Sequence, residues 1–356
     1  MKKHNFGAGP GILPEEVIAT AAKAVSDFNG SSLSLLEISH RSPAFEAVME
    51  EAEQLVRELL SIDDSYGVMF LTGGASTQFF MAPMNLLPES GKAAYIDTGV
   101  WSSKAIKEAK IFGQIETIAS SKDKNYNFIP LDFIVPKDAQ YLHYTSNNTI
   151  YGTEFHHVPK TDIPLVCDMS SDIFSRPING KDFGMIYAGA QKNMGPAGTT
   201  LVVVKKDLLG KTGKTLPSML DYQLHIANGS MYNTPPVFPI YVAMLTMRWI
   251  KSVGGLGEMQ KRNQAKAALL YSEIDQNPMF VGTAEKSSRS LMNVCFLLHD
   301  TSLEQSFLEA AKKAGIEGIK GHRSVGGFRA STYNALPLES VQVLVDLMQD
   351  FAKTKG

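Results

Sequence analysis

Short apolar segments alternate with helix-like segments through the first two thirds of the chain. Five apolar segments have the length and composition of buried strands, at residues 67–72, 93–96, 165–168, 185–188 and 200–204. Strands that alternate with helices are typical of an α/β protein, with a mostly parallel sheet flanked by helices. Ligands bind such sheets beyond the carboxyl ends of the strands, so polar residues directly after these segments are candidates for a site.

The pattern changes at about Gly254. A long helical stretch runs from there through Tyr271, and a strand-like segment follows at residues 291–298. A helix near residues 303–314, a glycine-rich turn region and an amphipathic terminal helix after Pro337 complete the chain. This part of the sequence therefore predicts a second, smaller α+β domain.

Length and composition place the chain among ordinary globular proteins. Its 356 residues suffice for about two domains. Hydrophobic residues make up 44% and charged residues 20%, and with a net charge of −2 no basic stripe dominates, which argues against nucleic acid or membrane partners. No apolar run reaches signal-peptide or membrane-span length, so we expect a cytoplasmic protein. Cys167 and Cys295 lie in apolar segments, which predicts buried, reduced thiols.

Glycines stand at a predicted strand-to-helix turn in residues 71–79, which read Leu-Thr-Gly-Gly-Ala-Ser-Thr-Gln-Phe. Such glycines let backbone N–H groups approach an anion, and the helix N-terminus adds its partial positive charge. The turn is therefore a candidate phosphate site. A tight turn with Ser76 or Thr77 capping the helix explains the same residues and stays open as an alternative.

Two residues at strand ends are candidates for cofactor chemistry. Asp168 ends one predicted strand, where a carboxylate can hold a protonated ring nitrogen, although a helix N-cap also explains it. Lys192 follows another strand within Ala-Gly-Ala-Gln-Lys-Asn-Met-Gly-Pro. Lysine forms imines with carbonyl cofactors when its surroundings lower its pKa. The small residues around Lys192 leave a cofactor room to reach the amine.

The chain has two tryptophans, Trp101 and Trp249. An indole face stacks on a flat heteroaromatic ring, which makes Trp101 in Asp-Thr-Gly-Val-Trp-Ser-Ser a candidate cofactor contact. Core packing is the alternative for Trp101. For Trp249, in Met-Arg-Trp-Ile, we predict packing in a helix interface.

Five cationic residues lie in two short segments. His40 and Arg41 follow Leu-Glu-Ile-Ser, whereas His322, Arg323 and Arg329 lie in a glycine-rich string. Arginine binds carboxylate and phosphate through a planar two-point fork, and histidine adds a donor near neutral pH. Together they can bind a substrate with two anionic ends. Solvated surface cations are the alternative.

Taken together, four strings resemble the phosphoserine aminotransferase family: residues 188–198, 321–331, 38–42 and 232–236. The resemblance runs from Asn5 to near the C-terminus. It implies a fold-type I, class V enzyme that depends on pyridoxal 5′-phosphate, needs no metal, and works as a homodimer with active sites at the subunit interface. It also implies a large cofactor-binding domain at residues 16–254 and a small domain at residues 1–15 and 255–356.

The resemblance assigns cofactor contacts residue by residue. Lys192 would form the Schiff base with the cofactor, Asp168 would pair with the pyridine nitrogen, and Trp101 would stack on the ring. The other cofactor contacts would be Ala75, Ser76 and Gln191 at the phosphate, Thr149 near the ring hydroxyl, and Asn233 with Thr234 at the phosphate in the neighbouring subunit.

The resemblance also assigns the substrate contacts. Arg329 would hold the α-carboxylate of the substrate. The substrate phosphate, or the side-chain carboxylate of glutamate, would be held by His40, Arg41, His322 and Arg323, with the first pair supplied by the partner chain. The implied reaction moves an amino group from glutamate to 3-phosphohydroxypyruvate, which gives 2-oxoglutarate and O-phospho-L-serine for serine biosynthesis. A related reaction in vitamin B6 biosynthesis is a further expectation.

The chain departs from the pattern of the family at two places. Gly7 stands where family members often carry serine, so no hydroxyl role falls to it. Ala75 and Ser76 stand where some members carry Gly-Arg, so backbone donors remain but any contact of an arginine side chain is lost.

Three other functions compete with this interpretation. Another class V enzyme, such as an alanine:glyoxylate aminotransferase or a cysteine desulfurase, fits the paired His-Arg segments and the two embedded cysteines less well. A nicotinamide dehydrogenase would use Gly7, Gly9 and Gly11, but no strand precedes them and Pro10 interrupts them. A cofactor-binding or interaction protein that has kept the fold without turnover is the third alternative, and the presence of the lysine, the carboxylate and the anion-binding arginines together argues against it.

Overall fold

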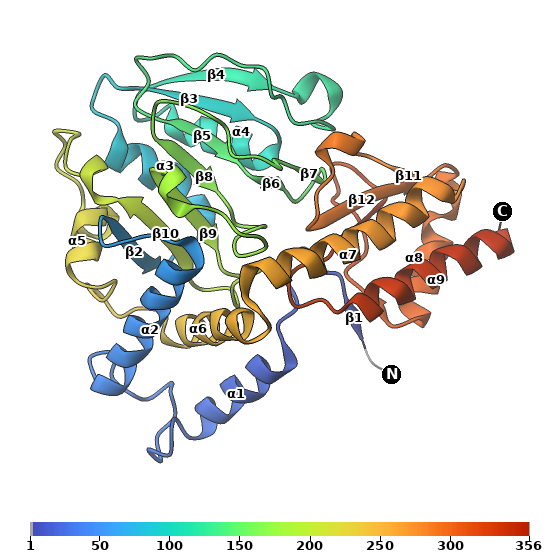
Figure 1. Ribbon diagram of the computed structural model, residues 1–356, viewed down its shortest axis with the longest axis horizontal. Coiled ribbons are helices and arrows are strands. Elements are labelled where there is room, and N and C mark those ends of the chain that lie inside the picture. Colours follow the sequence, from blue (N-terminus) through green and yellow to red (C-terminus); the bar gives the residue numbers. More distant parts are fainter. Residues whose placement is uncertain (1–2, 356) are drawn as a thin grey trace.

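The computed structural model describes residues 3–355, and its largest element is a seven-stranded sheet (Figure 1). The strands, in their order across the sheet, are β2 (Tyr66–Leu71), β10 (Thr200–Lys205), β9 (Met185–Gly189), β8 (Leu165–Asp168), β5 (Leu142–Thr145), β3 (Lys92–Asp97) and β4 (Gln114–Ser120). Strand β10 is antiparallel to both neighbours, and the other adjacent pairs are parallel. The predicted α/β fold with a mostly parallel sheet is confirmed.

Helices cover both faces of the large sheet because side chains alternate along each strand. Val68 and Phe70 of β2 pack in a core with α1, α2 and α6, whereas Met69 and Leu71 pack in a second core with α3, α4 and α5. The bounds of these helices are α1 (Glu15–Ser26), α2 (Pro43–Leu60), α3 (Gly74–Leu86), α4 (Val100–Ala109), α5 (Tyr222–Ala227) and α6 (Val237–Ser252). Trp249 of α6 packs against the first core, as predicted.

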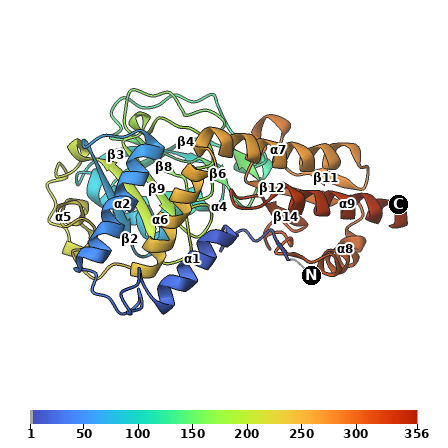
Figure 2. The ribbon, with the colours of Figure 1, turned by 60° about the horizontal axis from the view of Figure 1, so that its bottom comes forward.

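The remaining helices and strands build a smaller α+β part around a third core. It has an antiparallel sheet of β11 (Phe280–Gly282), β12 (Asn293–Leu298) and β14 (Phe328–Ser331), a parallel pair of β1 (His4–Asn5) and β13 (Ile316–Glu317), and the helices α7 (Gly255–Gln276), α8 (Glu304–Lys313) and α9 (Leu338–Lys355). Phe6 from the N-terminal segment joins this core, and Figure 2 shows that segment beside the C-terminal helices.

Helix α7 connects the two parts of the molecule. Its Met259 packs in the core with α1, α2 and α6, and its Leu270 packs in the small core. Figure 1 shows α7 extending from the large sheet to the small one. The domain boundaries at residues 16–254, 1–15 and 255–356 stay a prediction, and positions 1–2 and 356 lie outside the described residues.

The five strands predicted for the large sheet are present, whereas its β4 and β5 were not among the predicted segments. Their sequences explain the omission. Strand β4 lies at the edge of the sheet with mostly exposed or half-buried residues, and β5 has only four residues, including the buried His143. A short two-stranded sheet, β6 (Asn147–Asn148) with β7 (Thr153–Glu154), follows β5. Both cysteines are free and buried, as predicted. Within residues 3–355, no helix combines the length and apolar character that crossing a membrane requires.

Candidate active site

A cavity of about 120 Å3 lies beyond the carboxyl ends of β5 and β8, next to the N-terminal ends of α3 and α4. In an open α/β sheet this edge is where ligands bind, because the strand ends and the helix N-termini meet there. The cavity is lined by Gly74, Ala75, Ser76, Phe79, Trp101, Thr145, Asn147, Asp168, Ser170, Ser171, Gln191 and Lys192. The structure thus brings the predicted phosphate turn, the carboxylate, the indole and the lysine to one place.

Lys192 lies in the turn that follows β9, with its amine inside the cavity. Its Nζ donates a hydrogen bond to Thr149 Oγ1 at 2.6 Å. Burial lowers the pKa of the Lys192 amine from 10.5 to about 8, while the carboxylates of Asp168 and Asp172 act in the opposite direction and Arg329 lowers the pKa further. A substantial share of the amine is therefore uncharged near neutral pH, as a nucleophile or base requires.

Asp168 is the last residue of β8 and is buried. Its Oδ1 accepts hydrogen bonds from the backbone N–H of Ser170 at 2.9 Å and from the Ser170 hydroxyl at 2.6 Å. Burial raises the pKa of Asp168, although the Ser170 donors and the Lys192 charge oppose that effect. A cationic group beside Asp168 would offset the cost of burying its charge.

The first turn of α3 presents backbone donors without a side-chain cap. Gly73 is the N-cap residue with φ 92°, and no side chain hydrogen-bonds the first amides of the helix. Thr77 Oγ1 instead donates to the Gly73 carbonyl at 2.9 Å, so the alternative in which Ser76 or Thr77 caps the helix is wrong. A Cβ at Gly73 would come within 2.0 Å of Thr77 Oγ1, so this turn needs glycine. An anion can satisfy the amides of this turn.

Trp101, in the first turn of α4, is half-buried and lines the cavity. The ammonium of Lys104 lies 4.6 Å from its ring centroid. Its Nε1 is buried and has no hydrogen-bond partner within residues 3–355. Trp101 also packs against the core formed with α3 and α4, so the structure combines the two alternatives, core packing and a place in the cavity.

Arg329 of β14 reaches the same place from the small part of the molecule. Its Nη1 donates to the Thr149 carbonyl at 3.3 Å, and its buried Nε has no partner within residues 3–355. Thr149 therefore contacts both Arg329, through its carbonyl, and Lys192, through its hydroxyl. A guanidinium with free donors beside a reactive amine is suited to bind the carboxylate of an amino acid.

Comparison with known proteins agrees with this geometry. The aminotransferase class-V family matches residues 4–344. A phosphoserine aminotransferase of Flavobacterium psychrophilum is 61% identical over 98% of this chain and 99% of its own length, and one of Bacteroides fragilis is 59% identical over 99% of each.

The chain belongs to the phosphoserine aminotransferase family of class V. Two solved structures with this name are similar along their whole length. The enzyme from Bacillus circulans subsp. alkalophilus has 46% identity and a TM-score of 0.97, covering 100% of this chain and 99% of its own. The PLP-bound enzyme from Trichomonas vaginalis has 36% identity and a TM-score of 0.93, covering 98% and 100%. An alanine–glyoxylate aminotransferase from Nostoc, at 16% identity, shares the fold.

In this aminotransferase, His322 and Arg323 lie in the glycine-rich loop before β14. His322 is half-buried, and its Nδ1 lies 2.7 Å from the Ser324 hydroxyl, whereas Arg323 is exposed. Burial lowers the pKa of His322, and the positive charges of Arg329, Arg323 and Lys104 lower it further. Three cationic side chains, Arg329, Arg323 and Lys104, act on His322, and an anionic substrate group bound at this loop would offset their mutual repulsion.

Eight predicted site residues of the aminotransferase do not line the cavity around Lys192: Thr149, Arg329, His322 and Arg323, whose positions are given above, and His40, Arg41, Asn233 and Thr234. His40 is half-buried, and its buried Nε2 has no partner within the described chain. Arg41, Asn233 and Thr234 are exposed, and Asn233 lines a separate cavity of about 180 Å3. Their predicted roles involve a second subunit, so a single chain leaves them as predictions.

Several residues of the aminotransferase cavity were not singled out from the sequence. Thr145 and Asn147 line it because Thr145 ends β5 and Asn147 follows that strand, which the apolar pattern did not predict. Ser170 and Ser171 line it directly after Asp168, where the rule on strand ends provided a usable signal. The structure gives the positions of the other site residues, and their roles remain predictions.

Proposed function

We propose that this chain transfers the amino group of glutamate to 3-phosphohydroxypyruvate with pyridoxal 5′-phosphate as cofactor, giving 2-oxoglutarate and O-phospho-L-serine. One observation carries the proposal: the Lys192 amine, with a pKa of about 8, shares a cavity with the buried Asp168, and Arg329 stands beside them. The 61% identity to a phosphoserine aminotransferase along nearly the whole chain supports the choice of substrates.

The side chains of the cavity fit the cofactor at each of its ends. Lys192 would hold the aldehyde carbon through its amine, and Asp168 would pair with the protonated ring nitrogen, which would offset the burial of its charge. The uncapped first turn of α3, with Ala75 and Ser76, would hold the phosphate together with Gln191. Trp101 would stack on the ring.

Each residue then has a part in moving protons or binding substrate. Bound pyridoxal phosphate supplies an aldehyde for the amino group and a ring that takes up the electrons released at the substrate Cα. Lys192, once its amine is free, accepts the proton from the substrate Cα and later acts as the acid that returns a proton. Thr149 holds the Lys192 amine at 2.6 Å, so base and substrate stay in register.

Cationic groups would recognise both ends of each substrate. Arg329 would bind the α-carboxylate that glutamate and phosphoserine share, through the donors that its contact with Thr149 leaves free. His322 and Arg323 would hold the distal carboxylate or phosphate, together with the partner subunit's His40 and Arg41. A single pocket would thereby accept both dianionic substrates.

A homodimer is part of this proposal. Apolar side chains of α1 and the loop after it are exposed, with 53% of Ile18, 50% of Leu33 and 62% of Leu36 accessible. These side chains are available to a second copy of the chain, and the same loop continues to His40 and Arg41, which supports an interface here. We also propose a cytoplasmic location and a second reaction on the analogous substrate of vitamin B6 biosynthesis, 4-phosphooxy-threonine and its keto acid.

Reduction of the holoenzyme with borohydride, followed by peptide mass mapping, tests the proposal. A pyridoxyl group is expected on Lys192, and the Lys192→Ala variant is expected to carry none. With glutamate as donor, the enzyme should aminate 3-phosphohydroxypyruvate far faster than glyoxylate. A label on a different lysine would remove the assignment of Lys192, and a preference for glyoxylate would point to another class V activity.

A further inference from the structure

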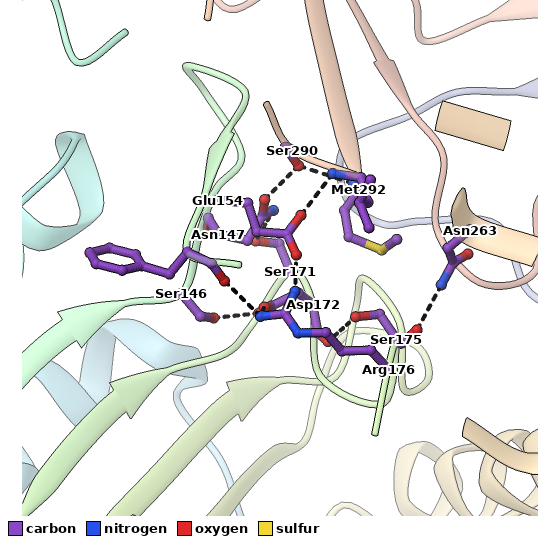
Figure 3. A network of polar contacts seen from close by, with 12 residues as sticks. Ser146, Asn147, Glu154, Ser171, Asp172, Ser175, Arg176, Asn263, Ser290 and Met292 are labelled. Carbon is purple, nitrogen blue, oxygen red and sulfur yellow. Dashed lines mark hydrogen bonds and ion pairs between the residues drawn. The ribbon is translucent and has the colours of Figure 1, made fainter. Parts of the chain in front are cut away.

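A network of buried polar side chains lies behind the cavity and extends from β8 to the small part of the molecule (Figure 3). Its charged members are Glu154, Asp172 and Arg176. Asp172 lies four residues after Asp168 and accepts a hydrogen bond from the Ser146 hydroxyl. Arg176 pairs with Glu154 through Nη1, and its Nη2 lies 3.4 Å from Asp172 Oδ2.

Glu154, at the end of β7, uses both of its carboxylate oxygens. Its Oε1 accepts from Arg176, and its Oε2 accepts from the backbone N–H of Leu291 at 2.7 Å. The side chain is 1% exposed, so water cannot replace either donor. Arg176 also donates to the Phe155 carbonyl at 2.9 Å, which holds the guanidinium in place. Glu154 therefore clamps the backbone just before β12 to the part of the protein that carries Lys192.

The clamped segment determines where Arg329 lies. Leu291 stands two residues before β12, and β12 pairs with β14 in a register that sets Cys295 opposite Arg329. A shift of the backbone at Leu291 moves β12 and, with it, the strand that carries Arg329. Asn147 adds a second tie, because its Oδ1 accepts from the Ser290 hydroxyl at 2.5 Å and its Nδ2 donates to Asn293 at 2.8 Å.

We propose that Glu154 is a positioning residue for amino transfer: by holding the N–H of Leu291 it sets the distance between Arg329 and Lys192. The inference rests on the proposed function, since it takes Arg329 as the group that binds the substrate carboxylate. The α-carboxylate that Arg329 binds takes no part in the bond changes, so displacing Arg329 should weaken substrate binding more than the chemistry on a bound substrate.

The substitution Glu154→Gln separates positioning from packing. Glutamine keeps the shape but has one oxygen, so its NH2 group must face either Arg176 or the Leu291 N–H. The cation holds the oxygen more strongly, which leaves Leu291 without an acceptor. We expect deuterium uptake at the Leu291 amide to rise about tenfold in the cofactor-free chain, KM for glutamate to rise about tenfold, and kcat to stay within about twofold.

Glu273→Gln is a matched control. Glu273 is 8% exposed and also uses both oxygens, accepting from Asn277 Nδ2 at 2.7 Å and Gln349 Nε2 at 2.9 Å. The same chemical change there costs stability, but we expect wild-type KM and wild-type exchange at Leu291. Should Glu154→Gln fail to fold, Glu154→Asp keeps the charge and withdraws the carboxylate by one bond, about 1.5 Å, and has the same expected direction for both readouts.

The inference is overturned if the Glu154 variants lose thermal stability while KM and Leu291 exchange stay at wild-type values. It is also overturned if Glu273→Gln raises KM as much as Glu154→Gln does. Leu291 exchange is read without cofactor or turnover, so it reports on the clamp even if the chain proves not to aminate 3-phosphohydroxypyruvate. Failure to aminate 3-phosphohydroxypyruvate would contradict the proposed function and leave the result on the clamp unaffected.

Discussion

The charges around Lys192 predict opposite effects for two substitutions in the cofactor-free protein. Asp168 raises the pKa of the Lys192 amine, and Arg329 lowers it. Replacing Asp168 with Asn removes a negative charge, so the pKa of Lys192 should fall below its wild-type value of about 8. Replacing Arg329 with Met removes a positive charge, so that pKa should rise.

The wild-type value sets the size of the effect. Burial takes the pKa of Lys192 from 10.5 to about 8, which corresponds to about 3 kcal/mol against the ammonium form. At pH 7.4, about one amine in five is then uncharged, compared with roughly one in a thousand at the ordinary value. Lys192 should therefore react with an acylating reagent about two hundred times faster than an ordinary lysine of equal nucleophilicity and access.

The assay is trace acetylation at a series of pH values from about 6 to about 10, with the peptide around Lys192 quantified by mass spectrometry. The midpoint of its labelling curve gives the pKa of the amine. Glu273→Gln, which lies outside the cavity, is the control and should leave the curve unchanged. A wild-type midpoint near the ordinary lysine value would refute the reasoning, and so would a shift of both variants in the same direction.

Two further predictions concern stability. Lys266 is 1% exposed and donates to the carbonyls of Thr332 at 2.9 Å and Tyr333 at 2.7 Å, and burial lowers its pKa to about 7. The unfolded chain keeps the proton of Lys266 up to about pH 10.5, so the free energy of unfolding should rise between pH 7 and 10.5. In urea unfolding, the slope of this rise should be smaller for Lys266→Met by up to ~1.4 kcal/mol per pH unit. An unchanged slope would count against this. Phe307→Ala should lower the free energy of unfolding in guanidinium by about 3–5 kcal/mol, because the ring is fully buried and its centroid lies 4.7 Å from that of Phe328. A loss below ~1 kcal/mol would show that the small core can collapse around the gap.

The strands that the sequence predicted are those whose residues are uniformly buried and apolar. Strand β10, with Leu201 to Val204 fully buried, is an example. Strand β5 was not predicted because a histidine interrupts its apolar residues. His143 is nevertheless buried, since its Nε2 lies 2.8 Å from the Tyr187 hydroxyl and its ring stacks on Tyr95 at 4.6 Å. A polar residue that finds its partner on another strand leaves no sign of burial in the local pattern.

In the candidate site, too, some features could be predicted from the sequence and others could not. Asp168 and Lys192 could be located from the sequence because the first ends an apolar strand and the second follows one, where a polar residue stands out. The link from Lys192 through Thr149 to Arg329 could not, because 137 positions separate Lys192 from Arg329 and no periodicity connects them. The hydrogen bond between Glu154 and Leu291 could not be predicted either. The two residues are also 137 positions apart, and the donor is a backbone N–H that any residue except proline could supply.

The sequence by itself determined which segments are buried, where the strands end, and which residue types are available for chemistry at those ends. These properties depend on the composition of a few neighbouring residues, so a local pattern records them. Only the tertiary structure decided that β10 runs against its neighbours, that the first turn of α3 is left uncapped, and that Asp168 and Arg329 act on the pKa of Lys192 with opposite sign. Strand direction and electrostatic effects depend on distances between residues far apart in the chain, and packing sets those distances.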